Sequence, residues 1–366
     1  MKGLLRRAAA VLLMAVLSVA AIAGCTKGKA VANVGGTGSM FGIVKSAQQV
    51  EKKTYEFNIT SDMNGSPADI KLSGASDGNA TSFSAEVSVG GMSFKLDNAV
   101  IFTDDAIYLN VATVMEELGS FAALMNGQMQ LPDLAELGIT SDWVYFESEG
   151  LFKQDMTVFD TIYSDLDEGY ADIITEKDGT HSITISDKDS VQKFIDATKA
   201  LIDNNGDEWA KLMTDQYNKL DIKKVVEDLT NQVLDAVVKA YEESAGEKLT
   251  EEQIAELKDS MMDEIDLSDM EEVNEDTYKE MFAEFKEQLA DVEAKDIGGT
   301  IDMRTSYSKG VYTFKATAEP DDEELGSMTC VGTVTEDKSA KVEVPSDAQP
   351  LIDIIAAFAV SQVAAQ

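Results

Sequence analysis

Between Tyr55 and Leu109 apolar residues alternate with polar ones, and short turn sequences interrupt the alternation. A period of two is that of a β-strand, whose successive side chains point to opposite faces of a sheet. The dipeptide Gly90-Gly91 stands between two alternating runs, which is typical of a tight hairpin. The pattern predicts an antiparallel meander with one apolar face and one polar face.

Helical spacing of three or four residues appears on both sides of this meander. It predicts helices over 41–53 and 111–125. Further strands are predicted over 143–146, 171–175, 182–185, 301–303, 312–316, 328–332 and 342–344. Helices and antiparallel strands that are segregated along the chain indicate an α+β fold.

A long acidic stretch, residues 187–293, separates the two sheet regions and is predicted to be helical. Two apolar stripes give its helices core-facing sides: Ile222, Val225, Val226, Leu229, Val233 and Val237 in one, and Tyr278, Met281, Phe282, Phe285 and Leu289 in the other. Thr250 with Gln253, and Ser268 with Glu271, have the spacing of a capping box. The charged residues on the other sides are most simply a solvated surface.

The charge balance excludes several classes of partner. The formal net charge is −37 at pH 7, and hydrophobic residues make up 44% of the chain. Phosphate contacts need clustered Lys and Arg, so we expect no nucleic-acid binding. The same charge argues against the body of the protein lying on an anionic bilayer. The apolar content is sufficient for a sizeable core.

The chain has few residues of the types used in catalysis or zinc binding, with two cysteines and one histidine. Cys330 lies in an alternating strand and is expected to be a small buried residue. His181 follows an Asp-Gly turn and leads into a strand. Neither a catalytic carboxylate pair nor a phosphate-binding glycine loop stands out. We therefore expect a non-enzyme without cofactor or metal, and no ligand-binding residue can be assigned.

One pattern of carboxylates has the spacing of a calcium site. Asp165, Asp167 and Glu176 have the first, third and twelfth spacing of a calcium-binding loop. However, Tyr170 stands where the turn of such a loop requires glycine, and Gly169 replaces an oxygen ligand.

The N-terminus has the features of an export signal. Lys2, Arg6 and Arg7 precede an apolar run over 8–23, which is too short and too poorly flanked for a stable spanning helix. The run ends in Ile22-Ala23-Gly24-Cys25, which resembles the lipobox of bacterial lipoproteins. That resemblance implies a signal peptide over 1–24 and lipidation of Cys25, and more than one acyl chain is what stable anchoring requires. Gly-rich residues 25–40 are expected to form a flexible tether.

The order of elements resembles the LolA/LolB/LppX-like lipoprotein superfamily over about 41–187 and 297–347. The matching segments are 46–57, where a helix passes into the first strand, 106–110, 143–146 and the closing 342–348. The resemblance implies a curved antiparallel sheet, a half-barrel, covered by helices. It implies a domain over 41–347, interrupted by the acidic helical insertion 187–293 and followed by a helical tail over 348–366.

These observations favour an exported lipoprotein held at the extracytoplasmic face of the cell membrane. The resemblance implies a binding or carrier protein for a lipid or other hydrophobic ligand, and the residues expected to line the concave face are Phe57, Ile59, Phe83, Val87 and Phe94. The same residues are equally expected if helices fill that face as an ordinary core. The alternative function is an envelope scaffold whose acidic helical arm docks a partner protein.

Overall fold

The computed structural model describes most of the chain after the tether: residues 38–63, 66–124, 134–135, 138–147, 158–218, 230–239, 242, 248–256, 274–290, 299–320 and 326–355. The predicted signal peptide, Cys25 and nearly all of the tether lie outside these residues. The chain divides into two compact units. The first comprises Met1–Asn98, Lys153–Gln216 and Asn274–Val342, and the second comprises Ala99–Phe152, Tyr217–Val273 and Glu343–Gln366.

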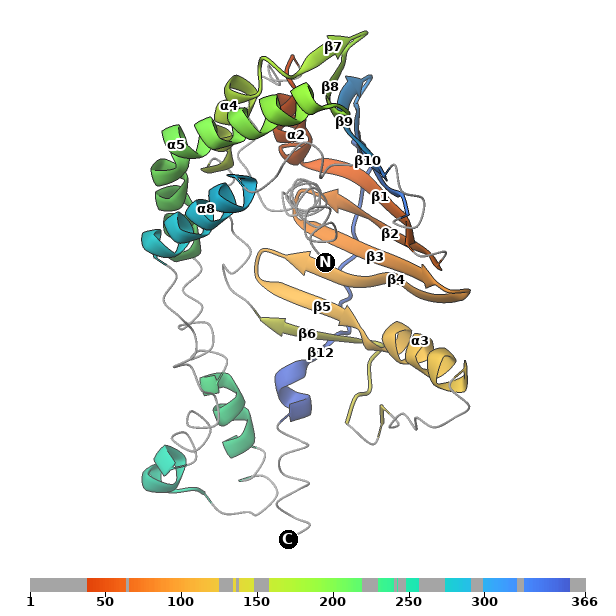
Figure 1. Ribbon diagram of the computed structural model, residues 1–366. Coiled ribbons are helices and arrows are strands. Elements are labelled where there is room, and N and C mark those ends of the chain that lie inside the picture. The colour runs from red at the N-terminus through yellow and green to blue at the C-terminus, as the bar shows by residue number, and fades with distance from the viewer. Residues whose placement is uncertain are drawn as a thin grey trace. The chain divides into compact units, whose positions relative to one another are not determined.

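The first unit carries most of the strands and the helices that pack on them (Figure 1). Its helices are α2 (Met40–Gln48), α4 (Val158–Gly169), α5 (Lys188–Asn218) and α8 (Glu275–Ala290). Its strands are β1 (Lys52–Met63), β2 (Ser66–Asp77), β3 (Ala80–Val89), β7 (Thr175–Lys177), β8 (Thr180–Ile185), β9 (Gly299–Ser308), β10 (Val311–Pro320) and β11 (Met328–Glu336). Strand β4 (Met92–Thr103) begins in this unit and ends in the second.

The strands of the first unit are hydrogen-bonded in the order β4-β3-β2-β1-β11-β10-β9-β8-β7. The pairs from β3 to β7 are antiparallel. The predicted meander is therefore confirmed, and β11 lies directly beside β1. Over the described residues the complete order holds 12 strands, mostly antiparallel, and does not close on itself. The α+β class is confirmed.

The second unit continues from β4 through β5 (Ala106–Asn110), α3 (Val111–Leu124) and β6 (Trp143–Glu147). Strand β12 (Gln349–Pro350) pairs with β6 in parallel. Tyr108 and Tyr145 are register partners whose rings stack at 5.4 Å. Of the predicted helical tail over 348–366, residues 351–355 are helical, and the residues after 355 lie outside the described part.

Two strand predictions are wrong. Residues 171–174 form a turn after α4, in which the amides of Ile173 and Ile174 both donate to the carbonyl of Tyr170 at 2.9 Å. Their apolar side chains pack against the core from this turn, which explains why the run resembles a strand. Residues 341–345 are also not a strand: Val342 donates to the Asp77 carboxylate at 3.2 Å, and Val344 is exposed.

The first helix ends five residues before the predicted limit of 53. Lys53 closes it, because this fully buried side chain donates from Nζ to the carbonyls of Ala47 and Gln48 at 3.3 and 3.1 Å. A cation at the C-terminus of a helix satisfies carbonyls that have no partner within the helix. Helix α4 was not predicted, and it contributes Tyr163 to the buried core.

The acidic stretch is helical where it is described, in α5, α8 and short segments over 230–239 and 251–256. Trp209 of α5 meets Phe282 of α8 edge to face at 6.2 Å, and Lys286 pairs with Asp203. Phe282 and Leu289 pack on the core as predicted, but Met281 is exposed.

The two predicted capping boxes have different outcomes. The Gln253 amide donates to the Thr250 hydroxyl at 3.3 Å, and the Thr250 amide donates to Gln253 Oε1 at 2.9 Å, so this box is confirmed. Four members of the first apolar stripe, Ile222 to Leu229, and the box at Ser268 lie outside the described residues.

The core of the first unit contains a close fit between a glycine and an aromatic ring. Gly332 of β11 is the register partner of Phe57, which is 1% exposed and stacks on Phe314 at 6.5 Å. A methyl group on Gly332 would overlap the Phe57 ring. The glycine therefore makes room for the ring on the face of the sheet.

We expect Gly332→Ala to destabilise the protein by about 1–3 kcal/mol, because overpacking forces the ring to move. The urea midpoint of unfolding measures the effect. In the double variant Gly332→Ala, Phe57→Leu the two costs should be less than additive, because the smaller side chain relieves the overlap. Strict additivity would contradict this packing.

Candidate functional site

The registers of seven neighbouring strands place their apolar residues on one face of the sheet. Register partners in an antiparallel sheet point to the same face, as do residues two apart along a strand. Three successive rows follow from the pairing. The first row is His181, Thr305, Phe314, Gly332, Phe57, Leu72 and Ala85. The second row is Ile183, Met303, Ala316, Cys330, Ile59, Ile70 and Val87. The third row is Ile185, Ile301, Ala318, Met328, Ser61, Ala68 and Val89.

These three rows contain no Asp, Glu, Lys or Arg, although charged residues make up 27% of the chain. The two-residue turn at Gly90-Gly91 extends the rows onto β4, where Leu96, Phe94 and Met92 continue them. We call this surface the uncharged face.

The opposite face of the same strands is polar. The row that lies between the second and third rows, but on that face, is Thr184, Asp302, Thr317, Thr329, Thr60, Asp69 and Ser88. A sheet with this division buries one side and leaves the other in water. The uncharged face is therefore the side that must be covered by protein or by a ligand.

Helices cover one half of the uncharged face. Met40, Phe41 and Val44 of α2 pack with Tyr163 of α4 and Ile195 of α5 against the β8–β10 side. Figure 1 shows α2, α4 and α5 together at that side of the unit.

Burial decreases along the second row from β8 towards β4. Ile183 is 2% exposed, Met303 is 7% exposed and Ala316 is 6% exposed. The members on the other strands, from Cys330 to Val87 and on to Phe94, are only half-buried. In the third row Val89 is 45% exposed, and Met92 beside it on β4 is 47% exposed. The described part of the chain therefore leaves the β1–β4 half of the face, which we call the open half, incompletely covered.

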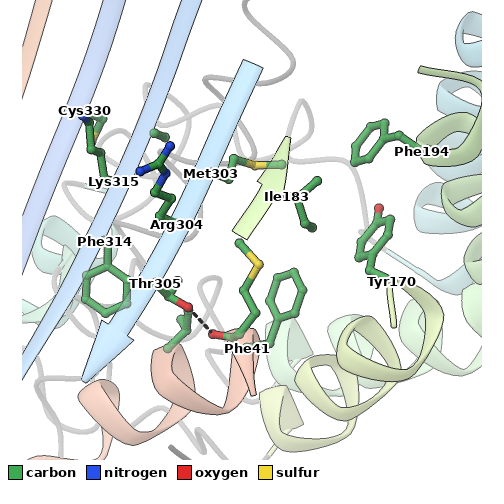
Figure 2. A pocket seen from close by; sticks show the side chains of 13 residues that line it. Phe41, Tyr170, Ile183, Phe194, Met303, Arg304, Thr305, Phe314, Lys315 and Cys330 are labelled. Carbon is green, nitrogen blue, oxygen red and sulfur yellow. Dashed lines mark hydrogen bonds between the residues drawn. The ribbon is translucent and has the colours of Figure 1, made fainter. Parts of the chain in front are cut away.

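A small apolar cavity lies where the covered half meets the open half. Its volume is about 50 Å³. Figure 2 shows Phe41, Tyr170 and Phe194 on one side of it and Ile183 and Met303 on the other. This space is far smaller than the roughly 300–1,000 Å³ of a pocket that encloses a small-molecule ligand, so it cannot enclose a whole lipid chain. The helix-covered half is a filled core.

Two buried phenols of the core, Tyr163 and the cavity-lining Tyr170, are neutral. Burial raises the pKa of Tyr163 to about 12, against a hydrogen bond from Gln48 that lowers it. Burial also raises the pKa of Tyr170, although its hydroxyl shares a hydrogen bond of 2.9 Å with Thr198. The surroundings of the cavity therefore carry no phenolate at physiological pH.

Helix α2 is held at its N-terminus by one carboxylate of α4. Asp167 accepts from the Ser39 hydroxyl at 2.6 Å, from the Phe41 amide at 2.9 Å and from the Gly42 amide at 3.0 Å. A carboxylate at a helix N-terminus satisfies amides that have no partner within the helix and favours the helix dipole. Met40 and Phe41 line the cavity, so Asp167 positions one of its walls.

We expect Asp167→Ala to lower the free energy of unfolding by about 1–2 kcal/mol, as loss of a helix cap does. Amide hydrogen exchange should become faster in residues 40–48 than in β1 or β11. Asp172→Ala, an exposed carboxylate in the next turn, is the matched control and should change neither quantity. Equal protection of α2 in both variants would contradict the capping role.

The structure brings the predicted lining residues together only in part. Phe57, Ile59, Val87 and Phe94 belong to the three rows, and Phe83 lies one row further towards α2 as a register partner of Gly74. Only Phe57 among them is fully buried. The predicted set leaves out Cys330 and Ile70, which adjoin Ile59 in the second row, and Ile183, Met303 and Ala316 in the helix-covered part of that row.

The other predicted site residues are placed as follows. His181 is 5% exposed on β8, and Cys330 is half-buried beside the cavity. The calcium hypothesis is wrong for this fold: Asp165 and Asp167 lie in helix α4 and Glu176 lies in strand β7, so they form no loop. Asp165 instead accepts a hydrogen bond of 2.8 Å from the Trp209 indole.

No family model, curated protein or solved structure matches the chain. Within the described residues no group of three or more His, Cys, Asp or Glu side chains could hold a metal ion. No helix among those residues has the length and apolarity needed to cross a membrane.

Proposed function

We propose that the chain is an exported lipoprotein, anchored through Cys25 to the extracytoplasmic face of the cell membrane. Its body is a non-enzymatic binding or carrier protein for a lipid or another hydrophobic ligand. The observation that carries the proposal is the open half of the uncharged face.

An apolar face that the protein covers incompletely, on a molecule whose surface is otherwise acidic, favours the binding of an apolar ligand. Contiguous exposed apolar patches are rare on soluble proteins and usually mark binding sites. Hydrocarbon removed from water gains roughly 25 cal/mol for each Å² that is buried. A ligand with long apolar chains would gain this free energy on both surfaces, and a face without charged groups imposes no desolvation penalty on it.

The sizes of the two spaces support one position for the proposed ligand. The cavity of about 50 Å³ has room for a chain end only. From β11, which lines the cavity, across the open half to β4 there are four strand intervals, roughly 19 Å at about 4.8 Å per interval. We propose that acyl chains lie across these strands with an end at the cavity. A curved half-barrel, of the kind that the lipoprotein superfamily resemblance implies, would wrap such chains.

The test is mass spectrometry of an organic extract of residues 26–366, produced without detergent. This chain lacks Cys25 and therefore has no covalent lipid. We expect stoichiometric lipid and a rise in melting temperature when acyl ligand is added, because a ligand bound only to the native state stabilises it. A chain without extractable lipid that does not respond to added ligand would overturn the carrier proposal. Salt-sensitive binding to basic proteins would then favour docking through the acidic helices.

A further inference from the structure

The β3–β4 hairpin (Figure 1) differs from the other hairpins in the chemistry of its turn. Among the connections that the structure describes, five are two-residue turns between consecutive strands. Four of these have a charged residue in the turn or directly beside it: 78–79, 104–105, 178–179 and 309–310. The fifth, Gly90-Gly91, has none, and the stretch from Val87 to Phe94 contains no Asp, Glu, Lys or Arg.

The two strand residues that flank the Gly90-Gly91 turn are large, apolar and exposed. Val89 is 45% exposed and Met92 is 47% exposed. Val89 lies on the uncharged face as the register partner of Ala68, and the two-residue turn places Met92 opposite Val89 on the same face. We call residues 89–92 the apolar tip. Adjacent exposed apolar side chains of this kind indicate a contact surface.

The apolar tip is the outer end of the open half. Val87 and Phe94, two positions further along each strand, are half-buried members of the second row. A hydrocarbon chain at the tip can therefore move onto the open half without passing a charged group, whose desolvation would oppose the movement. Asp62 and Asp69, which lie at this end of β1 and β2, belong to the polar face.

The predicted lipid anchor is close enough to bring the apolar tip to a bilayer. The Thr305 hydroxyl donates to the carbonyl of Met40 at 3.2 Å, so α2 begins over β9. From Thr305 to Val89 the sheet extends by five strand intervals, about 24 Å, and by four residues along the strands, about 13 Å. Cys25 and Met40 are 15 positions apart, and a chain of that length spans at most about 50 Å. The tip can thus reach the bilayer that holds Cys25.

We infer, on the basis of the proposed carrier function, that the apolar tip inserts into the lipid bilayer that anchors the chain, and that lipid moves along it between this bilayer and the open half. Two side chains alone bind a bilayer weakly, but the anchor makes the contact intramolecular and so raises its effective concentration. Because the net charge of −37 repels an anionic surface, the tip favours a bilayer of zero net charge.

Insertion is tested with a fluorescent dye at the tip. Residues 26–366 with Cys330→Ser and an N-terminal histidine tag are bound to phosphatidylcholine vesicles through a nickel-chelating lipid, which replaces the natural anchor. An environment-sensitive dye is attached at Met92→Cys or, as the matched control, at Asn79→Cys, an exposed position in the turn at the other end of β3.

We expect quenchers on the lipid acyl chains to remove most of the emission from the dye at position 92 and to leave the dye at position 79 unaffected. Equal quenching at both positions, or none at position 92, would overturn the insertion of the tip and leave the carrier function standing.

Passage of lipid along the tip is tested by the rate of uptake. The delipidated, tagged chain is bound to the same vesicles and released with imidazole after increasing times, and its lipid is quantified by mass spectrometry. We expect Val89→Ser, Met92→Ser to load about tenfold more slowly than the parent chain, because two apolar side chains no longer enter the hydrocarbon. The final lipid content should be similar, since a route changes the rate in both directions and not the equilibrium.

A methionine of equal exposure on a helix provides the control for this variant. Met281 of α8 is 47% exposed, and Met281→Ser should load at the rate of the parent chain. Loading of Val89→Ser, Met92→Ser at the parent rate would overturn the passage of lipid along the tip. A parent chain that takes up no lipid would overturn the carrier function and the passage together, while the quenching experiment decides insertion independently.

Discussion

Replacing Cys25 by serine is expected to release the protein from the membrane. The lipobox-like sequence predicts that the Cys25 sulfur carries diacylglycerol, and serine cannot form this thioether. Since anchoring depends on acyl chains at about 0.8 kcal/mol for each buried methylene group, loss of the lipid should remove membrane association almost completely. Membrane and soluble fractions of a bacterial host, probed for the chain, measure the result.

The second cysteine provides a matched control for this prediction. Cys330 lies on β11 within the folded body, so Cys330→Ser should leave the chain in the membrane fraction. The mass of the N-terminal peptide should show an added lipid in the parent chain and in Cys330→Ser, but not in Cys25→Ser. A Cys25→Ser chain that remains in the membrane fraction with its N-terminal segment removed would show that something else holds the protein there.

Local patterns in the sequence predict the meander well. From Tyr55 to Leu109 each strand alternates and each turn has its own signal, such as Gly90-Gly91 between β3 and β4. Both the pairing and the face of each residue follow from such local information, because neighbouring strands are joined by short turns. The signal for α4 was also present, since Phe159, Ile162, Tyr163 and Leu166 have helical spacing.

The uncharged face could not be derived in the same way. Ile59 of β1 and Cys330 of β11 are register partners although 271 positions separate them in the chain. No local pattern specifies such a pairing, because a long-range contact is decided by the packing of the whole sheet. The same holds for Asp167, whose role at the N-terminus of α2 depends on a contact 125–128 residues away. The spacing of Asp165, Asp167 and Glu176 along the chain suggested a calcium-binding loop. In the tertiary structure Asp167 instead caps the N-terminus of helix α2.

A carboxylate placed in the open half should abolish lipid binding while the fold persists. Ile70 is half-buried in the second row, between Ile59 and Val87. Aspartate there would be covered by the acyl chains of the ligand without a cation to pair with, and burial of an unpaired charge costs several kcal/mol. We expect Ile70→Asp to lower the lipid content of purified residues 26–366 at least tenfold, which corresponds to about 1.4 kcal/mol or more in binding free energy.

The control for this prediction lies on the same strand but on the opposite face. Ser73 is opposite Glu56 of β1, so Ser73→Asp introduces a like-charge pair that destabilises the native sheet. If lipid content follows the face and not the stability, Ser73→Asp retains its lipid although its urea midpoint falls. Equal lipid content in the two variants would mean that the ligand, if one is present, lies elsewhere than on the open half. If both variants lose lipid in proportion to the fall in their urea midpoints, the loss of binding is caused by unfolding and not by the charge on the open half. Only the separation of the two quantities assigns the open half as the binding surface.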